Sequence, residues 1–260
     1  MNHHPQIHRP ITLNAVAQPG RLLPDHSRQV MLYHDRGVLE AWYWGELPVA
    51  LPGRLLKAVA YIVPVYDPKE KDTHYVVTRF DWCENMDAFA LAAPTLGTQA
   101  DDVYRCRDLI AGVQHPAVRR LLSDVFTEPS VFFGFWTAPC LPSIAEGSLV
   151  RNAVALGEHF RDRAFLPQDH RDLGVAYAIL RDIGNVWSHA AKDSGGSHTN
   201  TLRLALERLD GPLTHFDAVC PVYAPVLHEL IHACKRAPTN QRAKVLLRYA
   251  SEVTITADCW

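Results

Sequence analysis

Residues 29–44 read QVMLYHDRGVLEAWYW: two stretches rich in apolar and aromatic residues flank the polar sequence HDRG at 34–37. Asp and Gly suit a tight hairpin turn, because both tolerate the backbone conformations found there. The pattern therefore predicts a β-hairpin with strands over Gln29–Tyr33 and Val38–Trp44.

A second hairpin is predicted further along the chain. Leu55–Tyr66 is rich in β-branched and aromatic residues, Asp67–Asp72 is a charged turn, and His74–Trp82 has the composition of another strand. Three or four strands joined by tight turns predict a small β-domain over residues 29–91, a curled sheet or a barrel. Residues 1–28 are rich in His and Pro, and we expect them to form an N-terminal arm outside this domain.

The remainder of the chain has helical periodicity. We expect a linker and a first helix over residues 92–116 and a helical domain over 117–260, which makes the fold class α+β. Ser148 and Thr239 are predicted N-caps. The expected helices are Ala117–Phe126, Ser148–Phe165, Arg171–Val186, Leu202–Leu209, Pro225–Arg236 and Gln241–Val253.

The segment Arg171–Val186 is apolar on every side, as a buried central helix would be. Arg181 and Asp182 lie near its end. Burying charge costs free energy unless the charge is paired or coordinated. This helix end is therefore the first place in the helical domain to look for a site.

The composition narrows the class of protein. No apolar run approaches the ~20 residues of a membrane-spanning helix, and the first residues lack the apolar segment of a signal peptide. The six cysteines form no CxxC pair, which indicates reduced thiols. We therefore expect a cytoplasmic protein with no membrane association. The formal net charge of −2 disfavours a dedicated duplex-DNA binder, so any contact with nucleic acid would be local.

Residues 117–253 resemble the HD domain of metal-dependent phosphohydrolases. The segments that carry the resemblance are Leu121–Phe126, GSLVRN at 147–152, ILRDIGNVW at 179–187 and Val245–Val253. The pattern is similar to bacterial exoribonucleases that join an OB-fold to an HD domain, and to relaxase-type proteins of conjugative elements. GVLEAW at 37–42 is similar to the OB-fold part. The resemblance implies an OB-like β-domain followed by an all-α HD-like domain, with a role in nucleic-acid processing or a mobile element.

The departures from the HD pattern fall on the metal ligands. Asn152 stands at the position of the first ligand His, Arg181 at that of the His in the His-Asp pair, and Ser251 at that of the last Asp; Asp182 alone remains. One carboxylate cannot hold a catalytic metal, so we expect a pseudoenzyme without a cofactor. Arg181 is expected to pair with Asp182, either in the space of the lost ion or simply closing the core. A residual phosphohydrolase rebuilt around Asp182 is the alternative.

A competing motif is HELIH at 228–232. On a helix, HExxH places His228 and His232 on one face to hold zinc, and Glu229 can act as general base. Glu252 has the spacing of a third ligand. The sequence before the motif predicts helix and loop rather than the β-sheet of such peptidases. A zinc metallopeptidase is therefore the second alternative.

Aromatic and basic residues gather in the β-domain. Trp42 and Trp44 alternate along one strand, and Lys57 and Arg79 lie on neighbouring strands. Exposed aromatic rings on such a sheet stack on single-stranded bases, and the cations can contact phosphates. For any single aromatic residue of this domain, a place in the domain core is the favoured alternative, because aromatic side chains are mostly buried. The expected partner is single-stranded nucleic acid or another protein.

Overall fold

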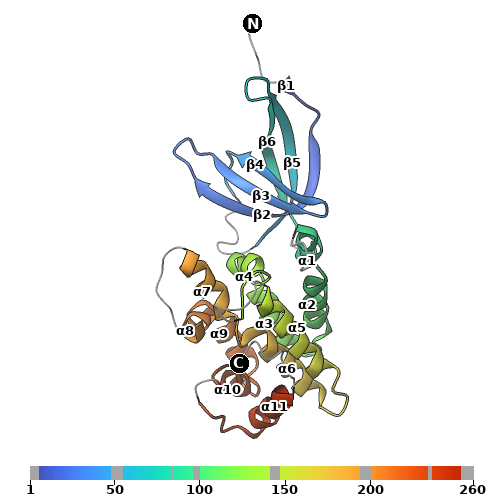
Figure 1. The fold of residues 1–260 in the computed structure, drawn as a ribbon, viewed down its shortest axis with the longest axis vertical. Coiled ribbons are helices and arrows are strands. Elements are labelled where there is room, and N and C mark those ends of the chain that lie inside the picture. The colour runs from blue at the N-terminus through green and yellow to red at the C-terminus, as the bar shows by residue number, and fades with distance from the viewer. Residues whose placement is uncertain are drawn as a thin grey trace. The chain divides into compact units, whose positions relative to one another are not determined.

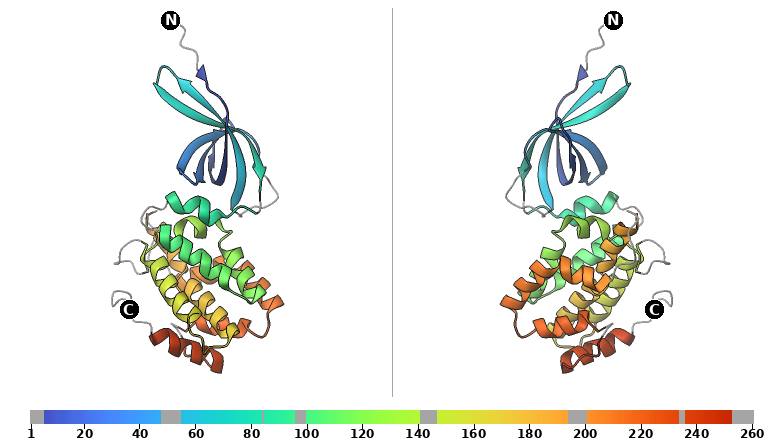
Figure 2. Two further views of the ribbon diagram at one scale, coloured as in Figure 1. Left: turned by 90° about the vertical axis from the view of Figure 1, so that its right-hand side faces the viewer. Right: turned by 90° about the vertical axis from the view of Figure 1, so that its left-hand side faces the viewer.

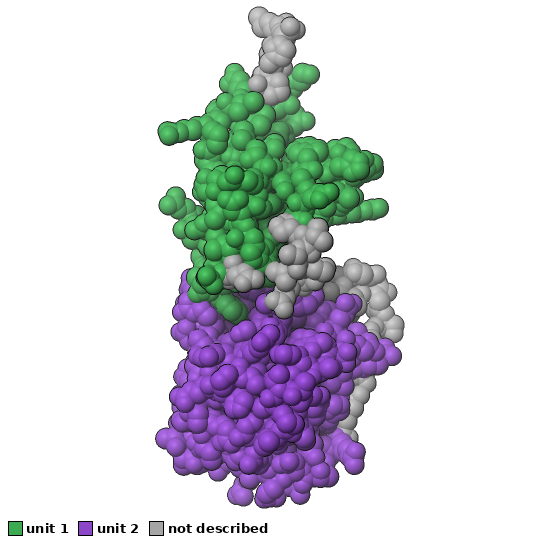
Figure 3. All heavy atoms as spheres, turned by 180° about the vertical axis from the view of Figure 1, so that it is seen from behind, with its two compact units in different colours: residues 1–100 green, residues 101–260 purple. Residues whose placement is uncertain are grey.

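The computed structural model describes residues 6–47, 55–83, 85–95, 100–140, 147–193, 201–233 and 236–252. The chain divides into two compact units, residues 1–100 and residues 101–260, shown in different colours in Figure 3. The first unit holds the β-strands and the second is helical (Figure 1). The predicted α+β class is therefore confirmed.

In its described residues, the β-unit contains six strands and one short helix. Both predicted hairpins are present, with bounds within two residues of those expected. Gly37 begins the second strand of the first hairpin at a φ of 146°, a conformation that residues with a Cβ rarely adopt. The strands are β1 Gln6–Ile7, β2 Ile11–Leu22, β3 Arg28–His34, β4 Gly37–Tyr43, β5 Leu56–Asp67 and β6 Asp72–Trp82, and the helix is α1 Ala88–Ala92.

The strands close into an OB-like barrel. β2 pairs with β3 and with β5, β3 pairs with β4, and β5 pairs with β6, all antiparallel. The ring closes through a parallel pairing of β4 with β6, at Trp42–Val76 and Tyr43–Val77. Counted from β2, the order around the ring is one, two, three, five, four, as in the five-stranded Greek-key OB barrel. β5 and β6 continue beyond the barrel as a long hairpin (Figure 2).

Small and large side chains fill the barrel interior together. The core includes five alanines, which leave room for larger residues in a narrow barrel. The Tyr43 and Phe80 rings meet edge to face, with centroids 5.0 Å apart. The buried core residues are Ala15, Ala17, Val30, Leu32, Ala41, Tyr43, Leu56, Ala58, Ala60, Ile62 and Val77.

The prediction of an arm over residues 1–28 is wrong from residue 6 onward, since β1 already pairs with β5. Residues 11–22 form β2, which lies between β3 and β5 in the barrel. Pro19-Gly20 suggested a loop, but Pro19 is paired with Val30 and an irregularity follows it in the strand. A Cβ on Gly20 would lie 2.9 Å from the carbonyl oxygen of Gln29, so glycine here permits the close approach of two strands. The β-unit also extends to residue 100 rather than 91.

The second unit is helical throughout its described part, as predicted. Two of its described helices, α4 and α9, had no counterpart among the predicted segments, and α7 shares only residues 184–186 with one of them. None of the described helices is both long and apolar enough to cross a lipid bilayer. The helices are α2 Ala100–Gly112, α3 Pro116–Val125, α4 Pro129–Gly134, α5 Ser148–Arg161, α6 Gln168–Leu180, α7 Gly184–Asp193, α8 Thr201–Arg208, α9 Asp210–Val219, α10 Ala224–Ile231 and α11 Gln241–Glu252.

The central helix is α6, in which every residue from Asp172 to Leu180 is buried. It packs closely on α5, because a Cβ on Gly174 would lie 2.3 Å from the Phe160 ring. The predicted segment Arg171–Val186 is therefore central, but it is not one helix: α6 ends at Leu180 and α7 begins at Gly184. Arg181 and Asp182 lie in the turn between the two helices.

Two predicted helix caps are wrong. Gly147 precedes α5 with a φ of 72°, and the Ser148 hydroxyl instead accepts a 2.8 Å hydrogen bond from the Cys140 amide. At α11 the side chain of Asn240, not Thr239, accepts a hydrogen bond from the Arg242 amide at 2.8 Å. The Ser148 and Thr239 side chains instead form hydrogen bonds with residues outside their own helices, Cys140 and Glu229.

Candidate functional site

The four predicted nucleic-acid contacts lie on the barrel unit. Trp42 falls between the core residues Ala41 and Tyr43, so strand alternation turns it outward. Lys57, between core residues 56 and 58, faces outward for the same reason. Trp44 follows the end of β4 and is 51% exposed. None of the four belongs to the barrel core, whereas the aromatic residues Tyr75, Phe80 and Trp82 of the same unit do pack against it.

Arg79 and Tyr61 form a defined pair on this outer face. They are directly opposed in the β5–β6 ladder, and the guanidinium carbon lies 4.1 Å from the centre of the Tyr61 ring. Arg79 also pairs with Asp81 at 2.9 Å. The Arg79 guanidinium thus lies over the Tyr61 ring, while Asp81 offsets much of its charge.

The residues of the HD-like pattern do not assemble into a described ligand set. Arg181 Nε donates to Asp182 Oδ2 at 2.8 Å, so the predicted pair exists. The Asp182 side chain is 37% exposed, however, and the pair is not buried as expected. Asn152 is half-buried on α5. Ser251 is exposed, and its hydroxyl donates to the Arg248 carbonyl of its own helix at 2.6 Å.

The two histidines of HExxH each have a structural partner. α10 ends at Ile231, so His232 lies just beyond the helix. Its Nδ1 is 2.7 Å from the carbonyl oxygen of His228. His228 Nε2 is 2.9 Å from Asp217 on α9. The ring centroids are 6.4 Å apart.

The two glutamates are also engaged elsewhere. The Glu229 carboxylate accepts hydrogen bonds from the Thr239 and Asn240 amides, at 2.9 and 2.7 Å. The hydrogen bond from the Thr239 hydroxyl is the main cause that lowers the pKa of Glu229, whereas a general base works best with a pKa near the working pH. Glu252 pairs with Arg163 at 3.0 Å. A cavity of about 260 Å³ lies beside Glu229 and His232, but it does not bring the motif residues together.

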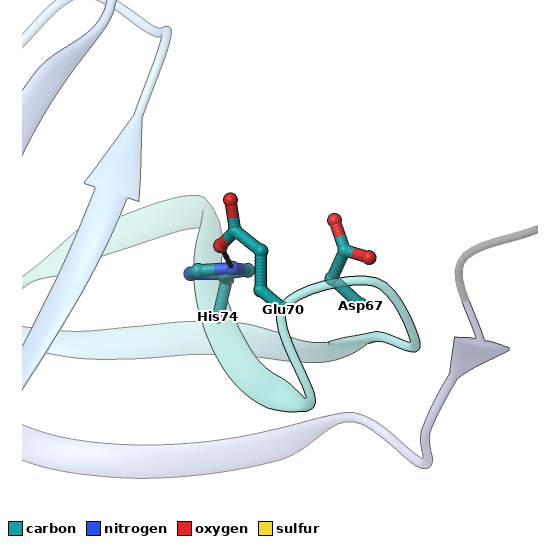
Figure 4. Close-up of side chains that lie close together, drawn as sticks. All are labelled: Asp67, Glu70 and His74. Carbon is teal, nitrogen blue, oxygen red and sulfur yellow. Dashed lines mark hydrogen bonds and ion pairs between the residues drawn. The ribbon is translucent and has the colours of Figure 1, made fainter.

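A different group of metal-ligating side chains does converge. Asp67, Glu70 and His74 each offer one ligand atom, and these atoms lie within 4.8 Å of one another (Figure 4). Among the residues that the structure describes, it is the one group of three or more His, Cys, Asp or Glu with this property. The sequence predicted a charged turn here and no site. The signal of the group is the pairing register of the hairpin, which local composition does not contain.

Comparison with known proteins leaves the family open. No protein-family model matches the chain, and no curated protein matches it. The OB-like barrel therefore rests on its strand order, and the HD resemblance stays a prediction from the sequence pattern.

Proposed function

We propose that this protein binds single-stranded nucleic acid on the outer face of its OB-like barrel. The observation that carries the proposal is the outward placement of Trp42 on a barrel with OB strand order, whose strands β5 and β6 also carry the Tyr61–Arg79 pair. OB barrels bind oligonucleotides on the face of their second and third strands, here β3 and β4, and through adjoining loops. Aromatic rings on such a face stack on bases of any sequence.

Charge favours a weak, stacking-based contact. The chain has a formal net charge of −2, and Asp81 lies next to Arg79. Phosphate neutralisation therefore supplies less of the binding free energy than in basic DNA-binding proteins. We expect a preference for single strands over duplex, because stacking requires unpaired bases.

In this proposal the helical unit acts as a scaffold rather than as a nuclease. Arg181 stands where an HD enzyme has a ligand His, and its guanidinium is paired with Asp182. A permanent cation next to the remaining carboxylate disfavours a divalent ion at that position. Incubation of the protein with an oligonucleotide and Mn²⁺ is expected to leave the strand intact. Cleavage that disappears in Asp182→Ala would instead establish a residual hydrolase.

The test is fluorescence anisotropy of a labelled single-stranded oligonucleotide. Trp42→Ala is expected to weaken binding about tenfold, because stacking on one aromatic ring contributes about 1–3 kcal/mol. Phe165→Ala is the matched control, since it removes an aromatic ring that is 63% exposed in the helical unit. Equal affinity of wild type and Trp42→Ala would overturn the proposed face. If the chain bound another protein and no oligonucleotide, its partner would be a protein rather than a nucleic acid.

A further inference from the structure

We infer that the β5–β6 hairpin is a binding site for one divalent transition-metal ion, held by Asp67, Glu70 and His74. The three side chains meet at the end of the hairpin, where β5 ends at Asp67 and β6 begins at Asp72 (Figure 4). His74 Nε2 lies 3.0 Å from Glu70 Oε2. The imidazole nitrogen thus already faces a carboxylate oxygen.

The strand register places two of the ligands on one face of the hairpin. Tyr75 packs against the barrel core, so its neighbour His74 faces the opposite way. His74 is paired with Val65, and Asp67, two residues after Val65, lies on the same face. Glu70 then reaches this face from the turn. The backbone thus places Asp67 and His74 on one face, and the Glu70 side chain completes the group.

The donor set selects the class of ion. One imidazole nitrogen with two carboxylate oxygens suits Zn²⁺ or Mn²⁺ better than Mg²⁺, which prefers oxygen and keeps its waters. Ligands bound to zinc lie roughly 3.4 Å apart in tetrahedral geometry with bonds of about 2.1 Å. The ligand atoms of the group lie within 4.8 Å of one another and must move closer together to bind an ion. Three protein ligands leave a coordination position for water or an external ligand.

The ligands are open to solvent, and the other hairpin provides a comparison. The His74 and Glu70 side chains are 40% and 65% exposed, so an ion can reach them directly. In the β3–β4 turn, His34 Nδ1 lies 3.6 Å from Asp35 and accepts a hydrogen bond from the Arg36 amide. That turn has no described third ligand. It therefore supplies a matched control of the same residue types.

The position of the ion suggests that it contacts bound nucleic acid. This part of the inference rests on the proposed function. His74 shares a face with Val76, two residues on, and Val76 is paired with Trp42. In OB barrels the loop between the fourth and fifth strands, here the β5–β6 turn, takes part in ligand binding. An ion on this turn would bind a phosphate oxygen of the strand stacked on Trp42. It would supply positive charge to a face whose Arg79 is offset by Asp81.

The experiment is titration of the full chain with Zn²⁺ by calorimetry, and with Mn²⁺ by electron paramagnetic resonance. Wild type is expected to bind one ion per chain, and His74→Asn to lose at least tenfold in affinity, with His34→Asn unchanged. Unchanged affinity in His74→Asn, or zinc lost only in His228→Ala, would overturn the site.

The phosphate contact is tested separately by anisotropy with and without Mn²⁺. Wild type should bind the oligonucleotide several-fold more tightly with the ion, and His74→Asn should show no such gain. If the affinity for the oligonucleotide were the same with and without Mn²⁺, the phosphate contact would be overturned and the proposed function would stand. Metal binding with no oligonucleotide binding would overturn the proposed function and leave the metal site standing.

Discussion

The end of α10 and the β5–β6 hairpin both carry histidine and glutamate, but their side chains are used differently. In the first region Glu229 holds the segment before α11, and His228 pairs with Asp217 on α9. In the second region Glu70 and His74 turn toward each other at an exposed hairpin end. Donor residues become a candidate site when they converge on one another, and serve structure when each bonds to a different neighbour.

The largest expected effect is on the free energy of unfolding, and it tests whether carboxylates of the helical unit stabilise the fold. Asp172, 3% exposed, accepts hydrogen bonds from the Gln114 and His115 amides and the Gln168 side chain, at 3.1, 2.7 and 2.8 Å. Asp172→Ala leaves two backbone amides without this acceptor, and we expect a loss of about 3 kcal/mol in the free energy of unfolding. Urea denaturation measures the change.

The matched variant is Asp182→Ala at the other end of α6. Its half-exposed ion pair with Arg181 should contribute less than about 1 kcal/mol. If Asp182→Ala lowered the free energy of unfolding more than Asp172→Ala, the conclusion that Asp172 is the more stabilising carboxylate would be contradicted.

A smaller effect is expected for Glu229→Gln. The hydrogen bond from Thr239 lowers the pKa of Glu229 from 4.5, so the ionised form stabilises the folded state above that pH. This contribution is lost as the pH falls through the lower pKa of the folded state. Thermal melts should show a lower Tm for the variant at pH 7, with the difference shrinking in acid.

Glu207→Gln, on the exposed face of α8, is the control for the loss of one negative charge. Zinc binding should be the same in wild type and in Glu229→Gln. If Glu229→Gln raised the Tm or abolished zinc binding, the conclusion that Glu229 serves only to stabilise the fold would be contradicted.

The smallest effect concerns His159 on α5. Burial, and then the charge of Arg163, lower the pKa of this histidine from 6.5. The unfolded chain therefore takes up a proton more readily, and stability should fall as the pH drops below about 6.5. His159→Gln should flatten this pH dependence in melts between pH 5 and pH 8. His215→Gln on α9 should keep the wild-type slope; a slope shared by both variants would exclude His159 as its source.

Local patterns predicted most of the barrel and the centre of the helical unit. The two hairpins followed from turn residues between β-branched and aromatic stretches, and the burial of α6 followed from its all-round apolar composition. β2 was missed because Pro19 and Gly20 suggest a loop. Their place in the strand depends on the approach of Gln29, a contact that local composition does not contain.

The candidate sites were predictable to different degrees. The outward aromatic residue Trp42 could be proposed from strand alternation. The Asp67 group could not, because its convergence depends on how β5 and β6 are paired and on the turn that carries Glu70. The HExxH spacing pointed to a zinc site, but its prediction took no account of Asp217 or Arg163, which contact the motif residues from distant parts of the chain.

The parallel pairing of β4 with β6 also constrains how the barrel forms. It joins residues 42–43 to residues 76–77, so it depends on contacts far apart in sequence. Such contacts are slow to form, because the intervening chain loses entropy before the pairing is gained. During synthesis, β4 emerges before β6 exists, and its edge has no partner strand until then. An edge of that kind can pair with other chains, so barrel closure is the step at which aggregation competes with folding.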